Sequence, residues 1–249
     1  RSIDRLKTQQ EKLIINERHE AWESLARKLA HEIKNPLTPI QLTIDRLRNK
    51  YSTQLNQDNS ENFKENLKII NYQIKQIEKL VNEFSDFARM PKPILKENDL
   101  VQIIHDNIKL LSDIDKKIQI GFKKSFDKIL FKGDKEQLSR VFLNLIKNSI
   151  ESIQQKAEKT SNFDMKISVE IISNNDHILI NIIDNGIGFD NFKENIKEIL
   201  HPYFTTKKNG TGLGLSIVNK IVNDHNGTMR FFPLKEGAKV EINFNLNDS

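Results

Sequence analysis

Residues 31–37 read His-Glu-Ile-Lys-Asn-Pro-Leu and lie in a predicted helix whose apolar residues recur every three or four positions. These apolar positions are Trp22, Ala26, Leu29, Ile33, Leu37, Ile40, Ile44 and Leu47. Such spacing is typical of a helix that packs along one seam of a bundle. His31 lies about 200° from both Leu29 and Ile33 at about 100° per residue, so we expect its imidazole to point away from the seam into solvent.

An exposed histidine on a helix is more often an ordinary surface residue than a reactive group. Here the residues within one turn on the same face are Arg27, Lys28, Lys34 and Asn35. Their charge would attract a polyphosphate or an acidic partner protein. The choice between a surface residue and a reactive one therefore depends on the rest of the chain.

Composition limits the classes of function. The chain has 249 residues, enough for two domains, with 37% hydrophobic and 29% charged residues. No run of about 18 apolar residues is present, so we expect no membrane contact within this fragment. The absence of cysteine excludes thiolate metal sites and fits a reducing cytosol. The net charge of +5 comes from interleaved charges without a basic block, so nucleic acid is not an expected partner.

The first part of the chain predicts a helical hairpin. Residues 1–20 are polar and read as a connector helix. Within residues 21–93, a second helix follows that of His31 and ends near Pro91 and Pro93. Its apolar positions are Phe63, Leu67, Ile70, Ile74, Ile77, Val81, Phe84 and Ala88. A lone hairpin buries only one side of such helices, so we expect two copies to form a four-helix bundle.

Residues 94–249 predict an α+β two-layer sandwich. Helices are expected near 99–111, from an N-cap at Asp134, and over 213–226. Strands are expected at 118–122, 129–131, 165–172, 178–183, 228–232 and 239–244. Helices on one face of such a mixed sheet define the sandwich.

Two amides share one face of the helix that follows Asp134. Asn144 and Asn148 are four residues apart, and Asn is a weak helix former. Asn148, with Asn144 as a second candidate, offers the hard oxygen that Mg²⁺ prefers together with phosphate oxygens. Lys147 would add positive charge beside them. Two ordinary surface amides are the simpler alternative.

Asp184-Asn185-Gly186-Ile187-Gly188 follows a predicted strand. A buried carboxylate at Asp184 would accept a hydrogen bond from the amino group of adenine and would repel the carbonyl group of guanine. Gly186 and Gly188 would let the backbone approach the ring. A plain turn is the alternative.

Gly210-Thr211-Gly212-Leu213-Gly214 leads into a helix, whose first N–H groups would face phosphate. Residues 189–209 lie between the two glycine clusters and suggest a lid. Within it, Phe204-Thr205-Thr206-Lys207 provides an apolar cover and a cation for phosphate. An ordinary loop is the alternative.

The order His-Glu-x-x-Asn-Pro, Asn-x-x-x-Asn, Asp-x-Gly-x-Gly, Phe-Thr-Thr-Lys and Gly-x-Gly-x-Gly resembles a bacterial two-component sensor histidine kinase. Residues 22–27, 35–42 and 82–93 are similar to the NtrY-like nitrogen-regulation sensors. The resemblance implies a dimerisation and phosphotransfer hairpin followed by a catalytic domain of the GHKL or Bergerat type, shared with Hsp90, gyrase B and MutL.

The resemblance also implies an activity. ATP with Mg²⁺ would phosphorylate His31, and an aspartate of a response-regulator receiver domain would then accept the phosphoryl group. Glu32 would orient the imidazole, and Asn35 would assist dephosphorylation of the regulator. The chain, which begins at Arg1, would be the cytoplasmic portion of a homodimeric sensor anchored in the inner membrane. Two alternatives are an ATP-gated clamp that does not label itself and a scaffold with an inactive pocket.

Overall fold

A computed structural model describes residues 29–51, 57–88, 90–160, 162–189 and 212–246. The chain divides into two compact units, Arg1–Pro91 and Lys92–Ser249. The connector helix predicted for residues 1–20 lies outside the described residues. Within the described ranges, no helix combines the length and apolar character needed to cross a bilayer.

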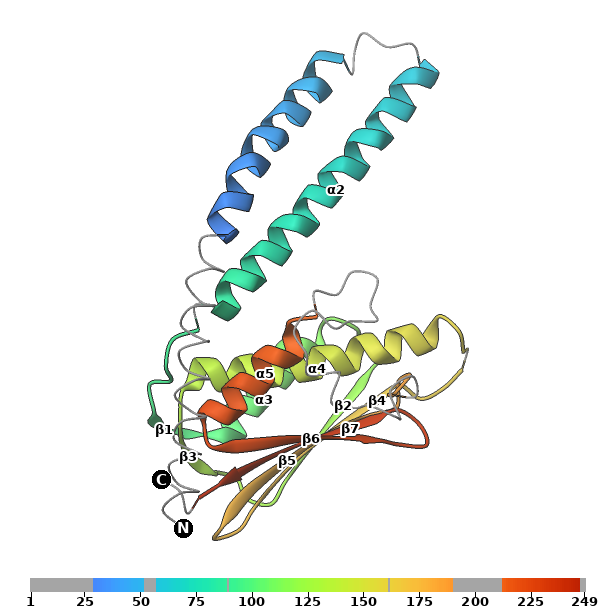
Figure 1. Ribbon diagram of the computed structural model, residues 1–249. Helices are drawn as coiled ribbons and strands as arrows, with labels where there is room; N and C mark the ends of the chain where they lie inside the picture. The colour runs from blue at the N-terminus through green and yellow to red at the C-terminus, as the bar shows by residue number, and fades with distance from the viewer. Residues whose placement is uncertain (1–28, 52–56, 89, 161, 190–211, 247–249) are drawn as a thin grey trace, which may run out of the picture. The chain divides into compact units, whose positions relative to one another are not determined.

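The first unit contains a hairpin of two long helices (Figure 1). The first is helical over residues 29–51, and α2 covers Gln57–Ala88. The apolar positions predicted for the seam divide into two sets. The buried set includes Leu37, Ile44, Leu67, Ile74 and Val81, and the exposed set includes Leu29, Ile33, Ile40, Leu47, Ile70 and Ile77. A single hairpin therefore leaves about half of these apolar side chains exposed, as the sequence predicted.

A pair of amides interrupts the apolar contact between the two helices. Gln41 lies between the buried residues Leu37 and Ile44 on the first helix, and Asn71 takes the equivalent position on α2. The Gln41 Nε2 donates a hydrogen bond to the Asn71 Oδ1. One polar layer thus lies between two apolar layers of the hairpin.

The second unit is built on a five-stranded sheet in the order β2-β4-β5-β7-β6. The strands are β2 Gln119–Lys124, β4 Lys166–Ser173, β5 His177–Asp184, β6 Gly227–Pro233 and β7 Ala238–Asn245. The β2 and β4 strands are parallel, and the other neighbours are antiparallel. Helices α3 (Leu100–Ser112), α4 (Lys135–Ala157) and α5 (Gly214–Asp224) cover one face of the sheet (Figure 1), which confirms the predicted two-layer sandwich.

Alternating side chains explain this arrangement. Ile178, Ile180 and Ile182 of β5 are buried, because residues two apart on a strand share one face. The apolar stripe of α4, which includes Phe142 and Ile146, is also buried. Full burial of one isoleucine or phenylalanine side chain contributes roughly 1.5–3 kcal/mol to the stability of the folded state. This core fixes α4 against β5, the two elements that carry the predicted amides and Asp184.

A small second sheet was not predicted in full. β1 (Lys96–Asp99) pairs antiparallel with β3 (Leu130–Gly133). The sequence predicted β3 but not β1, because the Lys-Glu-Asn-Asp sequence of β1 has no apolar residue to reveal its period. β1 forms because pairing with β3 satisfies its backbone groups.

Asp134 connects three segments of the second unit. Its side chain accepts hydrogen bonds from the N–H groups of Glu136 and Gln137, which confirms the predicted N-cap of α4, and from the N–H of Ile94 at 2.9 Å. Burial raises the pKa of Asp134, but these backbone hydrogen bonds outweigh burial and hold the pKa below its ordinary value. The N–H of Asp134 donates to the buried His225 Nε2 at 2.9 Å, at the end of α5. His225 is therefore a structural residue.

Candidate active site

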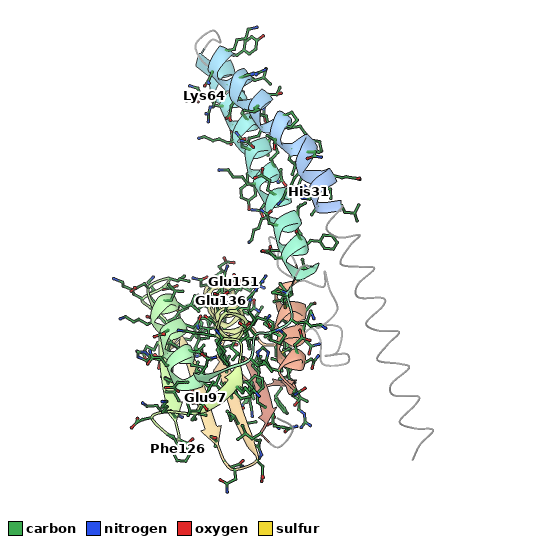
Figure 2. The ribbon with its side chains drawn as sticks, turned by 90° about the vertical axis from the view of Figure 1, so that its left-hand side faces the viewer. His31, Lys64, Glu97, Phe126, Glu136 and Glu151 are labelled. Atoms are coloured by element: carbon green, nitrogen blue, oxygen red, sulfur yellow. The ribbon has the colours of Figure 1, made fainter. Side chains whose placement is uncertain are left out.

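The predicted phosphoacceptor segment lies on the surface of the hairpin. His31 is exposed on the helix of residues 29–51 (Figure 2), and Glu32, Lys34 and Asn35 are exposed beside it. Leu37 is 6% exposed on the packed side of the same helix. The structure therefore agrees with the predicted exposure of the imidazole. Arg27 and Lys28, the cationic residues expected on the same helical face as His31, lie outside the described residues.

One of the predicted amides of α4, Asn144, faces the start of α5. Asn144 is partly buried, and its Nδ2 donates to the carbonyl oxygen of Arg140 at 2.8 Å. Its Oδ1 would lie 3.4 Å from a Cβ atom placed on Gly214. Asn148 is partly buried one turn further along α4, and Lys147 is exposed. The structure thus brings an amide of α4 and the second glycine cluster together, although they are distant in sequence.

Asp184 ends β5 as a buried carboxylate. It is 7% exposed, and its Oδ1 accepts a hydrogen bond from the N–H of Gly186 at 2.9 Å. Burial raises its pKa, and this effect outweighs the donors around it, which are Gly186, Ser149, Ser152 and Ala238. An ionised carboxylate is an acceptor only, so this side chain is suited to accept a hydrogen bond from a donor on a ligand.

The turn after Asp184 requires glycine because it packs tightly against its neighbours. A Cβ on Gly186 would lie 2.2 Å from the Ser152 Oγ, so a side chain there would displace α4. Gly188 adopts a φ of +68°, and its Cβ would lie 2.5 Å from the carbonyl oxygen of Gly237. Gly237 has a φ of +83°, and its Cβ would lie 1.9 Å from the carbonyl oxygen of Asp184. Both predicted glycines therefore keep the backbone close to neighbouring elements.

The second glycine cluster is only partly described. Gly212 is partly buried, Leu213 is fully buried, and Gly214 begins α5. Leu213 occupies the N-cap position of α5 and makes no side-chain cap hydrogen bond. The other predicted residues of this part lie outside the described residues, and they are Phe204, Thr205, Thr206, Lys207, Gly210 and Thr211. The lid expected at residues 189–209 therefore stays a prediction.

Sequence reasoning missed three residues that shape the surroundings of Asp184. Ser149 and Ser152 donate to its carboxylate from α4, and Gly237 packs against its backbone. A signal for Ser152 was present, because it continues the spacing of Asn144 and Asn148 by another four residues along the same helical face. Gly237 carried no local signal, since its contact is with a strand distant in sequence.

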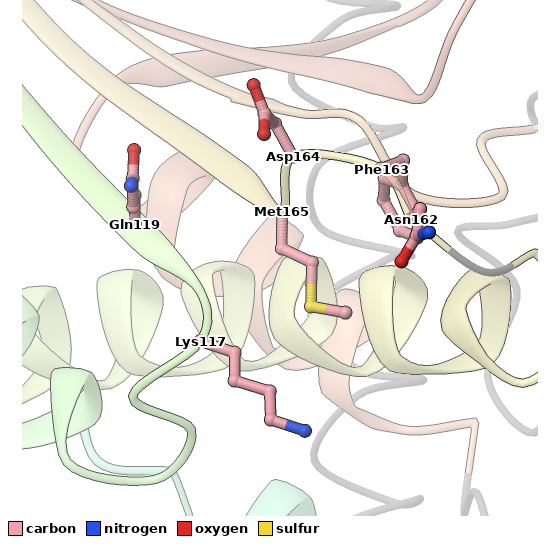
Figure 3. A pocket seen from close by; sticks show the side chains of 6 residues that line it. All are labelled: Lys117, Gln119, Asn162, Phe163, Asp164 and Met165. Carbon is pink, nitrogen blue, oxygen red and sulfur yellow. The ribbon is translucent and has the colours of Figure 1, made fainter.

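A pocket of about 350 Å³ lies beside this region (Figure 3). It is lined by Lys117, Gln119, Asn162, Phe163, Asp164 and Met165. The carbonyl oxygen of Asp164 accepts a hydrogen bond from Asn185, which joins the pocket to the turn after Asp184. Among the residues that the structure describes, none of those predicted to bind a nucleotide lines this pocket.

The donor set near α4 fits a metal that arrives with a nucleotide. Within the part of the chain that the structure describes, no group of three or more His, Cys, Asp or Glu could hold a metal ion alone. The candidate donors are the amide oxygens of Asn148 and Asn144. Mg²⁺ accepts one or two protein oxygens when phosphate oxygens and water complete its shell.

Comparison with known proteins defines the class of protein. Residues 21–93 match the His Kinase A (phospho-acceptor) domain, and residues 133–248 match the histidine kinase-, DNA gyrase B-, and HSP90-like ATPase family. The chain therefore belongs to the sensor histidine kinases, and its helical hairpin followed by an α/β ATPase domain has the fold class that the resemblance implied.

Among its relatives is a sensor histidine kinase of Rickettsia felis that is named NtrY-like. The chain is 36% identical to it over 247 residues, a match that covers 99% of this chain and 40% of that protein. The crystal structure of full-length ShkA in complex with AMPPNP matches with a TM-score of 0.65 and 19% identity, covering 89% of this chain and 45% of that one. Histidine kinase ThkA in complex with the response regulator protein TrrA matches with a TM-score of 0.64 and 22% identity, covering 97% and 66%. The structural matches support the fold alone.

Proposed function

We propose that this chain transfers the γ-phosphoryl group of ATP to His31. The observation that carries the proposal is the exposed imidazole of His31, on the helix that matches a phospho-acceptor domain. A surface histidine alone would carry no such weight. The same chain contains a buried carboxylate, two packed glycines and two amides in the ATPase-type domain, and this combination supports nucleotide binding.

The nucleotide contacts follow from the chemistry of each group. Asp184 accepts from the amino group of adenine, and Gly186 and Gly188 keep the adjacent backbone close to the ring. The start of α5 at Gly212-Leu213-Gly214 faces phosphate, because the first N–H groups of a helix and its dipole favour an anion. Gly210, Thr211 and the segment Phe204-Thr205-Thr206-Lys207 complete the phosphate side of this proposal.

Asn148, with Asn144 as a second donor, would hold Mg²⁺ against the triphosphate, and Lys147 would add positive charge. The metal would neutralise charge on the transferring phosphoryl group. The reaction also requires His31 to lie in line with the bond that breaks, because phosphoryl transfer depends mainly on the position of the reacting groups and on charge stabilisation. The segment Pro91–Pro93 is our candidate hinge for bringing ATP to the hairpin.

His31 acts as the nucleophile in its neutral form. One ring nitrogen forms a bond to the γ-phosphorus as the bond from that phosphorus to the β,γ-bridging oxygen breaks, and ADP leaves with the bond electrons. Glu32 accepts a hydrogen bond from the other ring nitrogen, which fixes the tautomer.

The phosphoryl group then passes to an aspartate of a response-regulator receiver domain. Asn35, one turn from His31, positions water for the reverse task of dephosphorylating that regulator. The exposed apolar set of the hairpin supports a homodimer in which two hairpins close a four-helix bundle. The parent protein is proposed to be an inner-membrane sensor, with this chain on its cytoplasmic side.

Incubation of the purified chain with γ-labelled ATP and Mg²⁺ tests the proposal. We expect label that is labile in acid and stable in base on the wild-type chain, and no label on His31→Gln. His105→Gln is the matched control, because His105 is also an exposed helical histidine but lies on α3. Equal labelling of wild type and His31→Gln would refute the assignment. ATP turnover without label would instead support an ATP-gated clamp.

A further inference from the structure

The carboxylate of Asp184 has more donors than the turn after β5 supplies. The Gly186 N–H and the Ser152 hydroxyl donate to its Oδ1, at 2.9 Å and 3.4 Å. The Ser149 hydroxyl and the Ala238 N–H donate to the same carboxylate. Ser149 and Ser152 are three residues apart and share one face of α4, so this helix supplies two hydroxyl donors to a side chain of β5.

These hydroxyl groups oppose the effect of burial. Asp184 is 7% exposed, and burial favours its protonated form, whereas donated hydrogen bonds favour its ionised form. Several charged side chains on or beside the adjoining elements pair with one another. Those pairs are Lys156–Glu236, Lys166–Asp164 and Lys239–Glu241. Hydrogen bonds therefore support the ionised form, and two of the four donors are serine hydroxyls.

We propose that the hydroxyl groups of Ser149 and Ser152 keep Asp184 as an acceptor-only carboxylate and thereby set the preference of the site for adenine over guanine. This inference rests on the proposed binding of ATP. An ionised carboxylate accepts from the amino group of adenine and repels the carbonyl group of guanine. A protonated carboxyl group has an O–H that can donate to that carbonyl. The two serines are positioning residues that act through Asp184.

The contact of Ser152 with the turn adds a geometric role. Its Oγ also accepts a hydrogen bond from the Ile187 N–H at 3.1 Å. One hydroxyl group therefore bridges the carboxylate and the backbone that follows it. Alanine at this position removes both contacts, whereas threonine keeps the hydroxyl group.

The test compares nucleotide binding by the full chain and by Ser149→Ala/Ser152→Ala. Dissociation constants for ATP and GTP are measured by calorimetry at about pH 6 and about pH 8. Loss of two donors would raise the pKa of Asp184 further, so its protonated fraction would be larger at the lower pH. We expect the preference for ATP to fall by up to about tenfold at the lower pH and by less at the higher pH. Ser139→Ala is the matched control, because its hydroxyl lies on the same helix but bonds to Asn107.

Each outcome has a definite meaning. An unchanged preference at both pH values, or an equal loss at both, would overturn the proposal, because only a change in protonation depends on pH. Absence of ATP binding by the wild-type chain would overturn the proposed function itself and this inference with it. If the double variant does not fold, the single variants Ser149→Ala and Ser152→Ala must each show a smaller loss at the lower pH, and Ser152→Thr must retain the preference.

Discussion

Replacing Gly237 by alanine should damage both the stability of the second unit and nucleotide binding. Gly237 has a φ of +83°, a conformation that costs an L-residue roughly 1–2 kcal/mol. Its new Cβ would lie 1.9 Å from the carbonyl oxygen of Asp184 and 2.6 Å from the Asn185 Cα. These contacts are with backbone, and β5 is paired with β7 through Asp184 and Ala238, so neither side can give easily.

Overpacking of this kind costs roughly 1–3 kcal/mol, which brings the expected total to about 2–5 kcal/mol. For a unit of this size the melting temperature should fall by roughly 4–20 °C. Displacement of Asp184 should weaken ATP binding by at least about tenfold, since a hydrogen bond to a charged group is lost. Scanning calorimetry measures the first effect, and titration calorimetry measures the second.

Gly121→Ala is the matched control for this experiment. Gly121 lies in β2, and a Cβ there would meet its nearest neighbour, the carbonyl oxygen of Ile167, at 3.9 Å, which is an ordinary contact. Its melting temperature should be unchanged or slightly raised, because glycine is unfavourable within a strand. The reasoning is refuted if Gly237→Ala melts and binds ATP as Gly121→Ala does.

Three further predictions address other parts of the chain. Ile40→Glu, at a position that is 45% exposed, should shift the chain from dimer to monomer in sedimentation velocity, and an unshifted dimer would contradict the proposed bundle. Asp134→Ala should lower the free energy of unfolding by about 1 kcal/mol in urea at neutral pH. Because the pKa of Asp134 is lowered on folding, this difference should persist above the ordinary pKa and vanish as pH falls through the lowered value; a constant difference would argue against the cap. Removal of Mg²⁺ by EDTA should abolish labelling of His31, and undiminished labelling would exclude the metal role.

The fold was predictable where side-chain period and turn chemistry are local. The β-branched alternation at 178–183 and the Asp134 cap were visible in the sequence, and both are present in the structure. β1 was not visible, because its four polar residues form a strand only through pairing with β3. The parallel pairing of β2 with β4 also has no local signal, since strand direction depends on the path that β3 and α4 take between these two strands.

The same division applies to the candidate site. Asp184, Gly186 and Gly188 lie within one stretch of five residues, so their spacing alone predicted a turn in which a carboxylate and a closely approaching backbone could contact a ligand. Gly237 and Ser152 reach this turn from elements far along the chain, and only the packing of β5 against β7 and α4 reveals them. A sequence shows which groups a turn contains, whereas the folded chain shows what holds that turn in place.

The amide pair in the hairpin constrains how the two helices can move. Sliding one helix along the other by a turn would place Gln41 and Asn71 against isoleucine or leucine, and each amide group would lose its partner in an apolar environment. Longitudinal slippage is therefore penalised more than a tilt or rotation that carries both helices together. A mechanical signal that enters through the first helix would be passed to α2 as a rigid-body motion, with the alignment of the two helices preserved.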